Sequence, residues 1–303
     1  MRSAAPGAGA GWLGQRERGS ALLLRLVVWL ARRLGRPATL PLLRLISLYF
    51  WLTAPAARRA SRDFLGRALG RRATAREVRR HVHAFALTIH DRVYLLSGGH
   101  AGFGVAVDDP DGLGERLAGG QGCILVGAHL GSFEVLRTLA VGENAFRLKV
   151  LMREGHNPML TRLLARLNPA VAATVMTWRG PEDALRLKEH LDGGHMIGML
   201  GDRLVEGERG VAVDFLGAPA PFPAGPVQLA AALKAPLYLF LGLCEGDRRY
   251  RARFELLAER VELPRAGREA ALRGYVARYA ERLGAHARAH PFEWFNFYPF
   301  WPP

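Results

Sequence analysis

Apolar residues recur along the chain with two periods, which alternate over most of its length. After about residue 120, short apolar runs typical of buried strands are followed by stretches with the 3.6-residue spacing of amphipathic helices. The predicted strands cover residues 123–127, 147–152, 171–176, 195–200, 211–215, 236–243 and 251–257. The predicted helices cover residues 132–141, 158–167, 181–191, 225–233 and 268–289. This alternation predicts an α/β fold with a mostly parallel central sheet flanked by helices.

The first part of the chain is predicted to be helical throughout. Two apolar runs, residues 20–34 and 40–57, precede two amphipathic helices at 56–69 and 74–97. Arginines interrupt both runs, so neither contains the roughly 18–20 uncharged residues that a spanning helix needs. A thin arginine stripe and the aromatic residues 49–51 suit a helix that lies in the lipid headgroup layer. We therefore expect an amphipathic membrane arm at 1–55 and a second domain at 56–303.

Positive charge is concentrated in the same part of the chain. The net charge is +15, and residues 1–80 hold 17 arginines against three acidic residues. This asymmetry predicts a polyanionic partner, either an anionic membrane surface or a nucleic acid. The apolar character of the helices favours anionic lipids, and no nucleic-acid-reading motif is present. The plainer alternative is that these helices cap the core of the main domain. Because Arg25 breaks the first apolar run, no secretory signal is expected, which favours the cytoplasmic face.

Several common catalytic signatures are missing from the sequence. There is no G-x-S-x-G elbow, no Walker A motif and no G-x-G-x-x-G after a predicted strand. His81 and His83 lack further ligands at metal spacing, so they are expected to be packed or exposed histidines, with no metal site. Cys123 and Cys244 lie in apolar runs and are expected to be buried, reduced thiols without an activating base.

The segment GCILVGAHLGSFEVLRTL carries the clearest chemical signal. A buried strand leads to His129, a Gly-Ser turn follows, and a helix begins near Glu134. Ligands and catalytic groups collect where strands of an α/β sheet end. A carboxylate that reaches the imidazole would fix its tautomer and raise its basicity, as a general base requires. The alternative is an ordinary helix start, in which Ser132 caps and Glu134 complements the helix dipole.

The same segment resembles the His-x4-Asp/Glu motif of the lysophospholipid acyltransferase superfamily. Its glutamate version resembles the branch of the lipid A biosynthesis (lauroyl/myristoyl) acyltransferases, a likeness that extends from about residue 20 to 258. Three downstream segments are also similar: LMREGHNPML with Arg153, TWRGPEDALRLKEHLDGG with Arg179, and GMLGDRLVEGERG with Asp202 and Arg203. The first residues and the aromatic end, EWFNFYPFW, are instead similar to a side branch associated with polyene-pigment or glycolipid gene clusters.

The resemblance implies a glycerolipid-acyltransferase-like fold and a role for each matching residue. His129 would be the base and Glu134 its orienting carboxylate. Arg153, Arg179 and Arg203 would bind donor phosphate or stabilise an oxyanion, the alternative for each being an exposed ion pair. Asp202 would position an arginine or the acceptor. No nucleophile accompanies His129, which favours direct transfer in a ternary complex over an acyl-enzyme.

The implied activity is that of an acyltransferase at the cytoplasmic face of a bacterial inner membrane, bound there as a monotopic or peripheral protein. It would move a fatty acyl group from acyl carrier protein or coenzyme A, used as co-substrate and without a cofactor, to a hydroxyl or amine of a lipid or glycolipid. Two other classes stay open. One is a non-enzymatic membrane- or lipid-binding protein, and the other is a nucleic-acid-binding protein that uses the arginine-rich arm.

Overall fold

The computed structural model describes residues 21–96, 102–141, 147–153, 169–204, 208 and 210–302. The chain divides into two compact units. The sheet unit comprises Asp91–Gly201 and Gly225–Tyr279, and the helical unit comprises Met1–His90, Asp202–Ala224 and Ala280–Pro303. This division follows packing alone, so the expected arm and domain, which meet between residues 55 and 56, stay a prediction.

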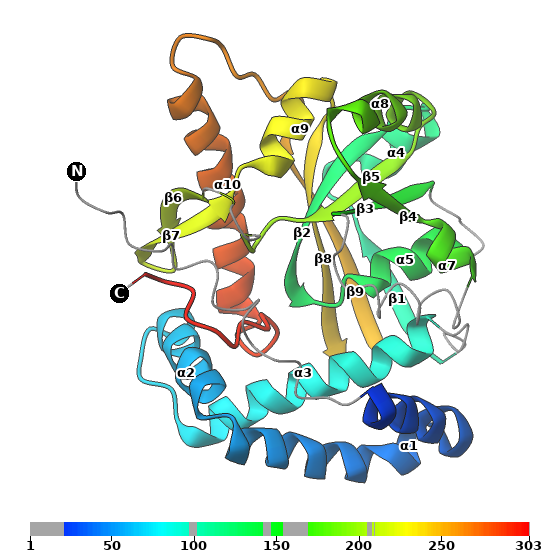
Figure 1. Cartoon of the computed structure of the whole chain (residues 1–303), viewed down its shortest axis with the longest axis vertical. Coiled ribbons are helices and arrows are strands. Elements are labelled where there is room, and N and C mark those ends of the chain that lie inside the picture. The colour runs from blue at the N-terminus through cyan, green and yellow to red at the C-terminus, as the bar shows by residue number, and fades with distance from the viewer. Residues whose placement is uncertain are drawn as a thin grey trace. The chain divides into compact units, whose positions relative to one another are not determined.

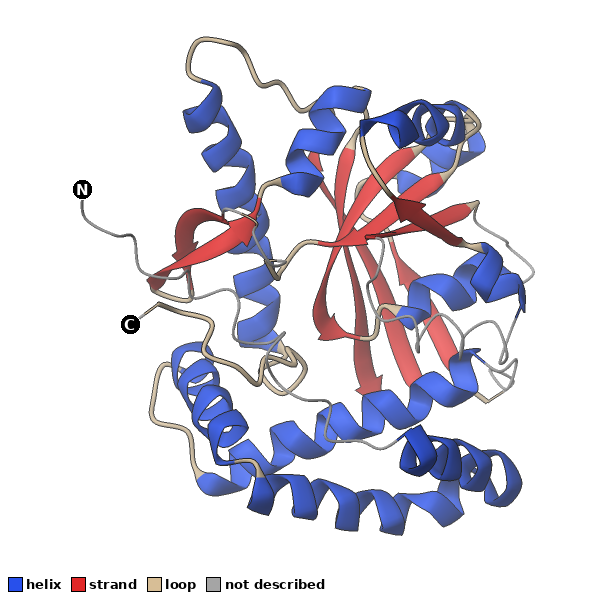
Figure 2. Cartoon of the chain, in the orientation of Figure 1, coloured by secondary structure: helices blue, strands red, loops and turns tan. Residues whose placement is uncertain are grey.

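The sheet unit is built on one seven-stranded sheet, drawn in red in Figure 2. Its strand order is β1-β9-β8-β2-β5-β3-β4, and every neighbouring pair is parallel except the β8–β9 hairpin. The strands are β1 (Gly104–Asp108), β2 (Cys123–Gly131), β3 (Leu148–Arg153), β4 (Val175–Trp178), β5 (Met196–Leu200), β8 (Leu237–Gly246) and β9 (Arg249–Ala258). The predicted α/β fold with a mostly parallel sheet is therefore confirmed.

Helices cover the sheet and explain why its central strands are continuously apolar. They are α4 (Leu113–Ala118), α5 (Glu134–Val141), α7 (Pro169–Ala173), α8 (Ala184–Asp192) and α9 (Gly225–Leu233), labelled in Figure 1. Helix α5 packs against β8 and β9, α8 against β5, and α9 against β2. Strand β2 lies between β8 and β5, and all of its residues but His129 are buried. A strand covered on both faces reads as an unbroken apolar run, which is what residues 123–127 show.

The structure corrects four details of the sequence prediction. Strand β1 and helix α4 were not predicted, and residues 171–173 belong to α7 rather than to a strand. A short apolar run does not distinguish helix from strand, and here Pro169 favours a helical first turn. Strand β7 (Ala218–Pro223) was missed because it contains three prolines; it pairs only with β6 (Gly210–Phe215), so its other edge needs no N–H donors. The helix predicted at 158–167 lies outside the described residues.

Serine and threonine hydroxyls join the first helices of the helical unit to histidines of the third. These helices are α1 (Ala21–Thr53), α2 (Pro55–Leu69) and α3 (Ala75–Leu96), and α1 bends at Gly35, whose φ is 75°. Thr39 Oγ1 lies 2.7 Å from His90 Nε2, Ser47 Oγ 3.0 Å from His83 Nδ1, and Ser61 Oγ 2.8 Å from His81 Nδ1. One face of α1 is thus part of the protein's packed interior, and His81 and His83 are packed histidines.

No single helix among the described residues has the length and apolar content to cross a membrane. Gly35–Thr53 and Pro55–Leu69 meet these criteria only when taken together, as a pair bent by 95°.

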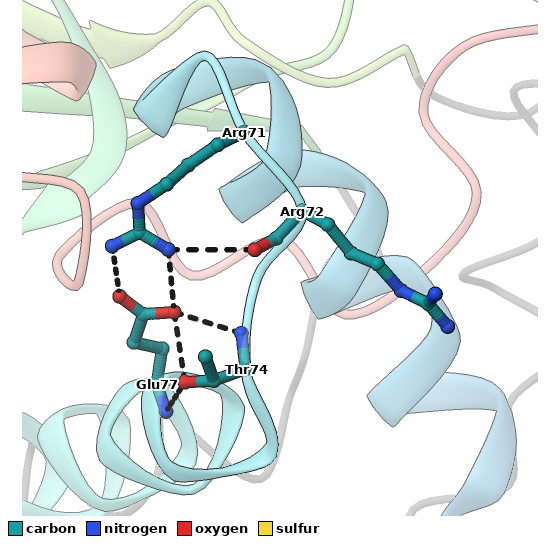
Figure 3. Close-up of polar contacts among 4 residues, drawn as sticks. All are labelled: Arg71, Arg72, Thr74 and Glu77. Carbon is teal, nitrogen blue, oxygen red and sulfur yellow. Dashed lines mark hydrogen bonds and ion pairs between the residues drawn. The ribbon is translucent and has the colours of Figure 1, made fainter.

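The turn between α2 and α3 shows why α3 begins where it does (Figure 3). Glu77 accepts hydrogen bonds from the Thr74 backbone N–H (2.8 Å) and hydroxyl (2.9 Å), while its own N–H donates to Thr74 Oγ1 (3.2 Å). This reciprocal arrangement is a capping box. Arg71 adds an ion pair at 2.5 Å, and these donors together lower the pKa of Glu77 to about 2. The turn is therefore fixed by its own side chains.

Aromatic residues of the C-terminal segment form the core of the helical unit. Trp294 is fully buried. The centroid of its ring lies 4.8 Å from that of Phe64 of α2 and 5.1 Å from that of Phe215 of β6. Trp301 stacks on Phe215 and donates its Nε1–H to the Phe215 carbonyl at 3.0 Å. The aromatic end of the chain therefore contributes the large apolar side chains that this unit buries.

Both cysteines are free thiols. Cys123 is fully buried in β2, and burial raises the pKa of its thiol. Cys244 is only half-buried near the end of β8, where its thiol contacts the Gly246 carbonyl at 3.3 Å. The expectation that both are buried is therefore correct for Cys123 and wrong for Cys244, because the apolar run of β8 continues past the covered part of the sheet.

Acidic pH is expected to destabilise the protein through His81. Burial lowers the pKa of this imidazole to about 4, and its Nε2–H donates to the Trp294 carbonyl at 2.9 Å. Because the unfolded chain takes up a proton near pH 6.5 and the folded chain does not, stability falls as the pH drops from about 6.5 to 4, by roughly 2–3 kcal/mol. Urea titrations at pH 7 and 4.5 measure this loss. His81→Gln should show a smaller difference between the two pH values, and an unchanged difference would contradict the assignment.

Candidate active site

A three-residue bulge in β2 sets the position of His129. Strand β2 pairs regularly with β8 up to Gly127, which stands opposite Phe240, and pairing resumes where Gly131 stands opposite Gly242. Three residues of β2, from Ala128 to Leu130, therefore lie opposite the single residue Leu241. Bulges of this kind change the direction of a side chain and are frequent at active sites. His129 is accordingly the one half-buried residue of an otherwise buried strand.

Two glycines allow the strand to return to its partner directly after the bulge. Gly131 has a φ of +72°, and a Cβ there would lie 2.1 Å from the Gly242 carbonyl oxygen. A Cβ on Gly242 would lie 2.1 Å from the Ser132 carbonyl oxygen. The Ser132 N–H donates to Gly242 O at 2.8 Å. This close backbone approach fixes the end of β2, and with it the turn that leads to Glu134.

Glu134 is the first residue of α5, and its carboxylate is buried. Glu134 Oε2 forms an ion pair with Arg92 Nε of α3 at 2.9 Å, without hydrogen-bond geometry at that nitrogen, and accepts a hydrogen bond from the Ser132 hydroxyl at 3.4 Å. The corner between β2 and α5, residues 129–134, thus holds an ion-paired carboxylate five residues after His129. An orienting contact between His129 and Glu134 remains a prediction.

Two arginines of this corner were not predicted from the sequence. Arg92 interrupts the apolar end of α3 next to Asp91, and Arg137 follows Glu134 by one helical turn in α5. Arg137 is 4% exposed, and its guanidinium interacts electrostatically with Glu134 and Arg92. A charged residue at a core-facing position of an amphipathic helix is unusual. That break in the apolar pattern was the available signal.

The other predicted site residues are at the end of β3, after β4 and in the helical unit. Arg153 ends β3, and its side chain is outside the described part of the structure. Arg179 follows β4 with its side chain exposed, while its backbone N–H donates to the buried Asp183 carboxylate at 2.9 Å. Asp202 and Arg203 belong to the helical unit. Asp202 is fully buried and accepts the Trp294 indole N–H at 3.0 Å, and Arg203 donates to the Phe295 carbonyl at 2.7 Å.

Within the described ranges, no group of three or more histidine, cysteine, aspartate and glutamate side chains is arranged to hold a metal ion.

A comparison with protein families decides the protein's class. The family model described as bacterial lipid A biosynthesis acyltransferase matches residues 21–301. The chain belongs to this family. The resemblance that the motifs around His129 and Arg179 indicated is therefore confirmed, over nearly the whole chain. No curated protein gives a significant match to the sequence.

Membership of this family makes the protein an acyltransferase of lipid biosynthesis. Its reaction therefore requires an acyl donor and a lipid acceptor. The family match also includes the helices of residues 21–96 and the C-terminal aromatic segment, so both are parts of the acyltransferase fold.

Proposed function

We propose that the protein transfers a fatty acyl group from an acyl thioester to a hydroxyl or amine of a lipid or glycolipid, with His129 as general base. The donor would be acyl carrier protein or coenzyme A. The observation that carries the proposal is the corner between β2 and α5. There a half-buried histidine on a bulge precedes a buried, ion-paired glutamate by five residues in a lipid A acyltransferase family member.

The proposed reaction is a direct transfer between two bound substrates. Neutral His129 accepts the proton of the acceptor O–H or N–H while the acceptor atom forms a bond to the thioester carbonyl carbon. The tetrahedral intermediate then breaks its C–S bond, and the imidazolium returns the proton to the leaving thiolate. Glu134 would hold the imidazole in the tautomer that presents its basic nitrogen to the acceptor. The scheme uses no metal or cofactor.

Different observations support the proposed roles of the predicted arginines and of Asp202. Arg179 presents an exposed guanidinium, which suits a donor phosphate or an oxyanion. Arg153 keeps the same proposed role. For Asp202 and Arg203, the contacts with Trp294 and Phe295 favour a part in holding the C-terminal segment. A role of these two residues at the acceptor or donor stays a proposal.

The test is acyl transfer from a labelled thioester into a total lipid extract, with acyl carrier protein and coenzyme A offered separately. Label should enter a lipid product, and the free thiol should appear in equal amount. Binding of lipid vesicles without any loss of thioester would contradict the proposal and favour a non-enzymatic lipid-binding protein.

We also propose that one face of α1 binds the cytoplasmic surface of the inner membrane as a monotopic or peripheral element. Its packed face carries Thr39, Leu43 and Ser47, and the opposite face exposes apolar side chains to solvent. These are Leu42, Leu45, Leu48, Tyr49 and Leu52. Single exposed apolar residues are common, but a continuous stripe on one helix face indicates an interaction surface. The exposed Arg44 supplies attraction to anionic headgroups.

Negative charge introduced on this face should release the protein from anionic vesicles without unfolding it. Leu45 is 65% exposed and Leu52 57% exposed, so Leu45→Glu with Leu52→Glu removes apolar insertion and adds repulsion at little cost to packing. Binding should fall by about 10-fold or more, from a loss of at least roughly 1.5 kcal/mol of apolar burial per leucine. Flotation with anionic vesicles measures it.

A matched control is Leu185→Glu in α8, where the leucine is 69% exposed outside this face. It should bind vesicles like the unaltered protein. Equal binding by the double variant would contradict the membrane assignment. Salt-dependent retention on DNA with no vesicle binding would instead favour the nucleic-acid alternative.

A further inference from the structure

Glu134 is placed beside two arginines in a buried environment. Arg92 Nε lies 2.9 Å from Glu134 Oε2, with the Arg92 side chain 28% exposed and that of Glu134 6% exposed. Arg137 is almost completely buried, and its Nε and Nη1 atoms make no hydrogen bond within the described structure. An arginine buried with unpaired donors carries a large desolvation cost. Such a cost calls for a reason other than stability.

The three charges act on one another. Burial lowers the pKa of the Arg137 guanidinium, the Glu134 carboxylate raises it, and Arg92 lowers it further. The same carboxylate is therefore attracted by one cation in contact with Oε2 and by a second cation one turn along its own helix. Asp91, the acidic neighbour of Arg92, accepts the Tyr250 hydroxyl at 3.1 Å.

We propose that Arg92 and Arg137 are positioning residues that fix the Glu134 carboxylate for its contact with His129. This inference rests on the proposed acyl transfer and deepens it. Arg92 and Ser132 both engage Oε2, so Oε1 is the oxygen assigned to the imidazole. Arg137 is the counter-charge that keeps the carboxylate at the start of α5. Neither arginine touches a reacting atom.

The geometry makes the two arginines unequal. If Arg92 is lost, Glu134 keeps a cationic neighbour in Arg137, whose Nε and Nη1 donors then compete for the carboxylate. The carboxylate would turn away from His129, while the charge of the corner would stay paired. If Arg137 is lost, the Arg92 contact to Oε2 persists. We therefore expect Arg92→Ala to impair catalysis more than Arg137→Met, which removes the buried charge and keeps an apolar side chain of similar length.

The experiment is a double-mutant cycle on the acyl-transfer assay. Arg92→Ala should lower kcat by about 10-fold or more, which is the size of effect expected for coupled residues in contact. The KM for the thioester donor should change less than twofold. Combining Arg92→Ala with Glu134→Gln should be no worse than Glu134→Gln alone. Methylguanidinium should restore part of the activity of Arg92→Ala, since the site is partly exposed, and methylammonium should restore less.

Arg260→Ala provides the control, because this arginine of the sheet unit is exposed and paired with Glu262. It should keep normal kcat and KM. Melting curves accompany every variant. If Arg137→Met does not fold, Arg137→Lys replaces it; because lysine keeps the counter-charge, kcat should fall less than in Arg92→Ala, with KM unchanged.

Normal kcat in Arg92→Ala, or losses that add fully in the double variant, would overturn the positioning role while leaving the proposed function in place. Absence of acyl transfer by the unaltered protein would overturn the proposed function, and this inference with it. A loss in Arg92→Ala that appears only in KM would also overturn the positioning role, because it would show that Arg92 binds the donor.

Discussion

His129→Ala is expected to lower the rate of acyl transfer by about 10²–10⁴-fold, the usual worth of a positioned proton transfer. His129 lies on the bulge of β2 and is half-buried, so part of its side chain already faces solvent. The melting temperature should therefore stay close to that of the unaltered protein. The measurement is transfer of label from an acyl thioester into total lipid, with a melting curve for each variant.

The glutamate variants test whether Glu134 acts together with His129. Glu134→Ala should cost less than His129→Ala, because an imidazole without its carboxylate is still a base in a less certain tautomer. The variant that lacks both side chains should be hardly slower than His129→Ala, since the two act as one unit. Glu134→Asp should keep partial activity. Near-normal transfer by His129→Ala, or fully additive losses, would refute the dyad.

The outline of the sheet was predictable because strand burial has a direct sequence signature. Strand β2 is covered on both faces, so its residues form an apolar run that ends at the candidate base. The bulge was not predictable, because it depends on how Gly131 and Gly242 approach each other from strands more than 100 residues apart. No local sequence pattern indicates how closely Gly131 and Gly242 approach each other.

The same distinction applies to the candidate site. His129 and Glu134 follow from a motif within a single strand–turn–helix segment. Arg92 joins them from a helix some 40 residues earlier, so its ion pair with Glu134 is a tertiary contact that spacing could not reveal. Asp202 was predicted as a site residue from a family-like segment, and the structure adds a contact with Trp294, from the far end of the sequence. Position after a strand identifies candidate residues, and only packing identifies their partners.

The helices near the N-terminus had two alternative predictions, and the structure bears on one of them. The arginine-rich apolar runs predicted a membrane arm, with packing onto the main domain as the alternative. Thr39 and Ser47 of helix α1 contact histidines of α3, so one face is packed, while Leu45 and Leu52 are exposed and the membrane role of their face stays a proposal. Sequence periodicity predicts that a helix has an apolar face, but it does not predict which neighbour covers that face. The helix is more apolar than its packing onto α3 requires, and the exposed remainder is the surface assigned to the membrane.

Gly131→Ala is expected to destabilise the protein by about 3–5 kcal/mol, the range of the most damaging single substitutions. Two penalties combine there. The new Cβ would lie 2.1 Å from the Gly242 carbonyl oxygen, and the φ of +72° is a left-handed conformation that alanine adopts at a cost. Because the clash involves backbone on both sides, relief requires β2 and β8 to separate. That separation would also displace His129, so acyl transfer should fall even in the fraction of molecules that remains folded.

Two other glycines divide this effect into its parts. Gly120 has a φ of +76°, and a Cβ added there would meet no described atom within 4 Å, so Gly120→Ala measures the backbone penalty alone, about 1–2 kcal/mol. Gly242→Ala measures the clash alone, because its Cβ would lie 2.1 Å from the Ser132 carbonyl oxygen without the left-handed φ. Chemical denaturation of the three variants should give the smallest loss for Gly120→Ala and larger losses for Gly242→Ala and Gly131→Ala. If Gly131→Ala were no less stable than Gly120→Ala, the close approach of the two strands could not be what fixes the bulge, and the position of His129 would have to depend on another contact.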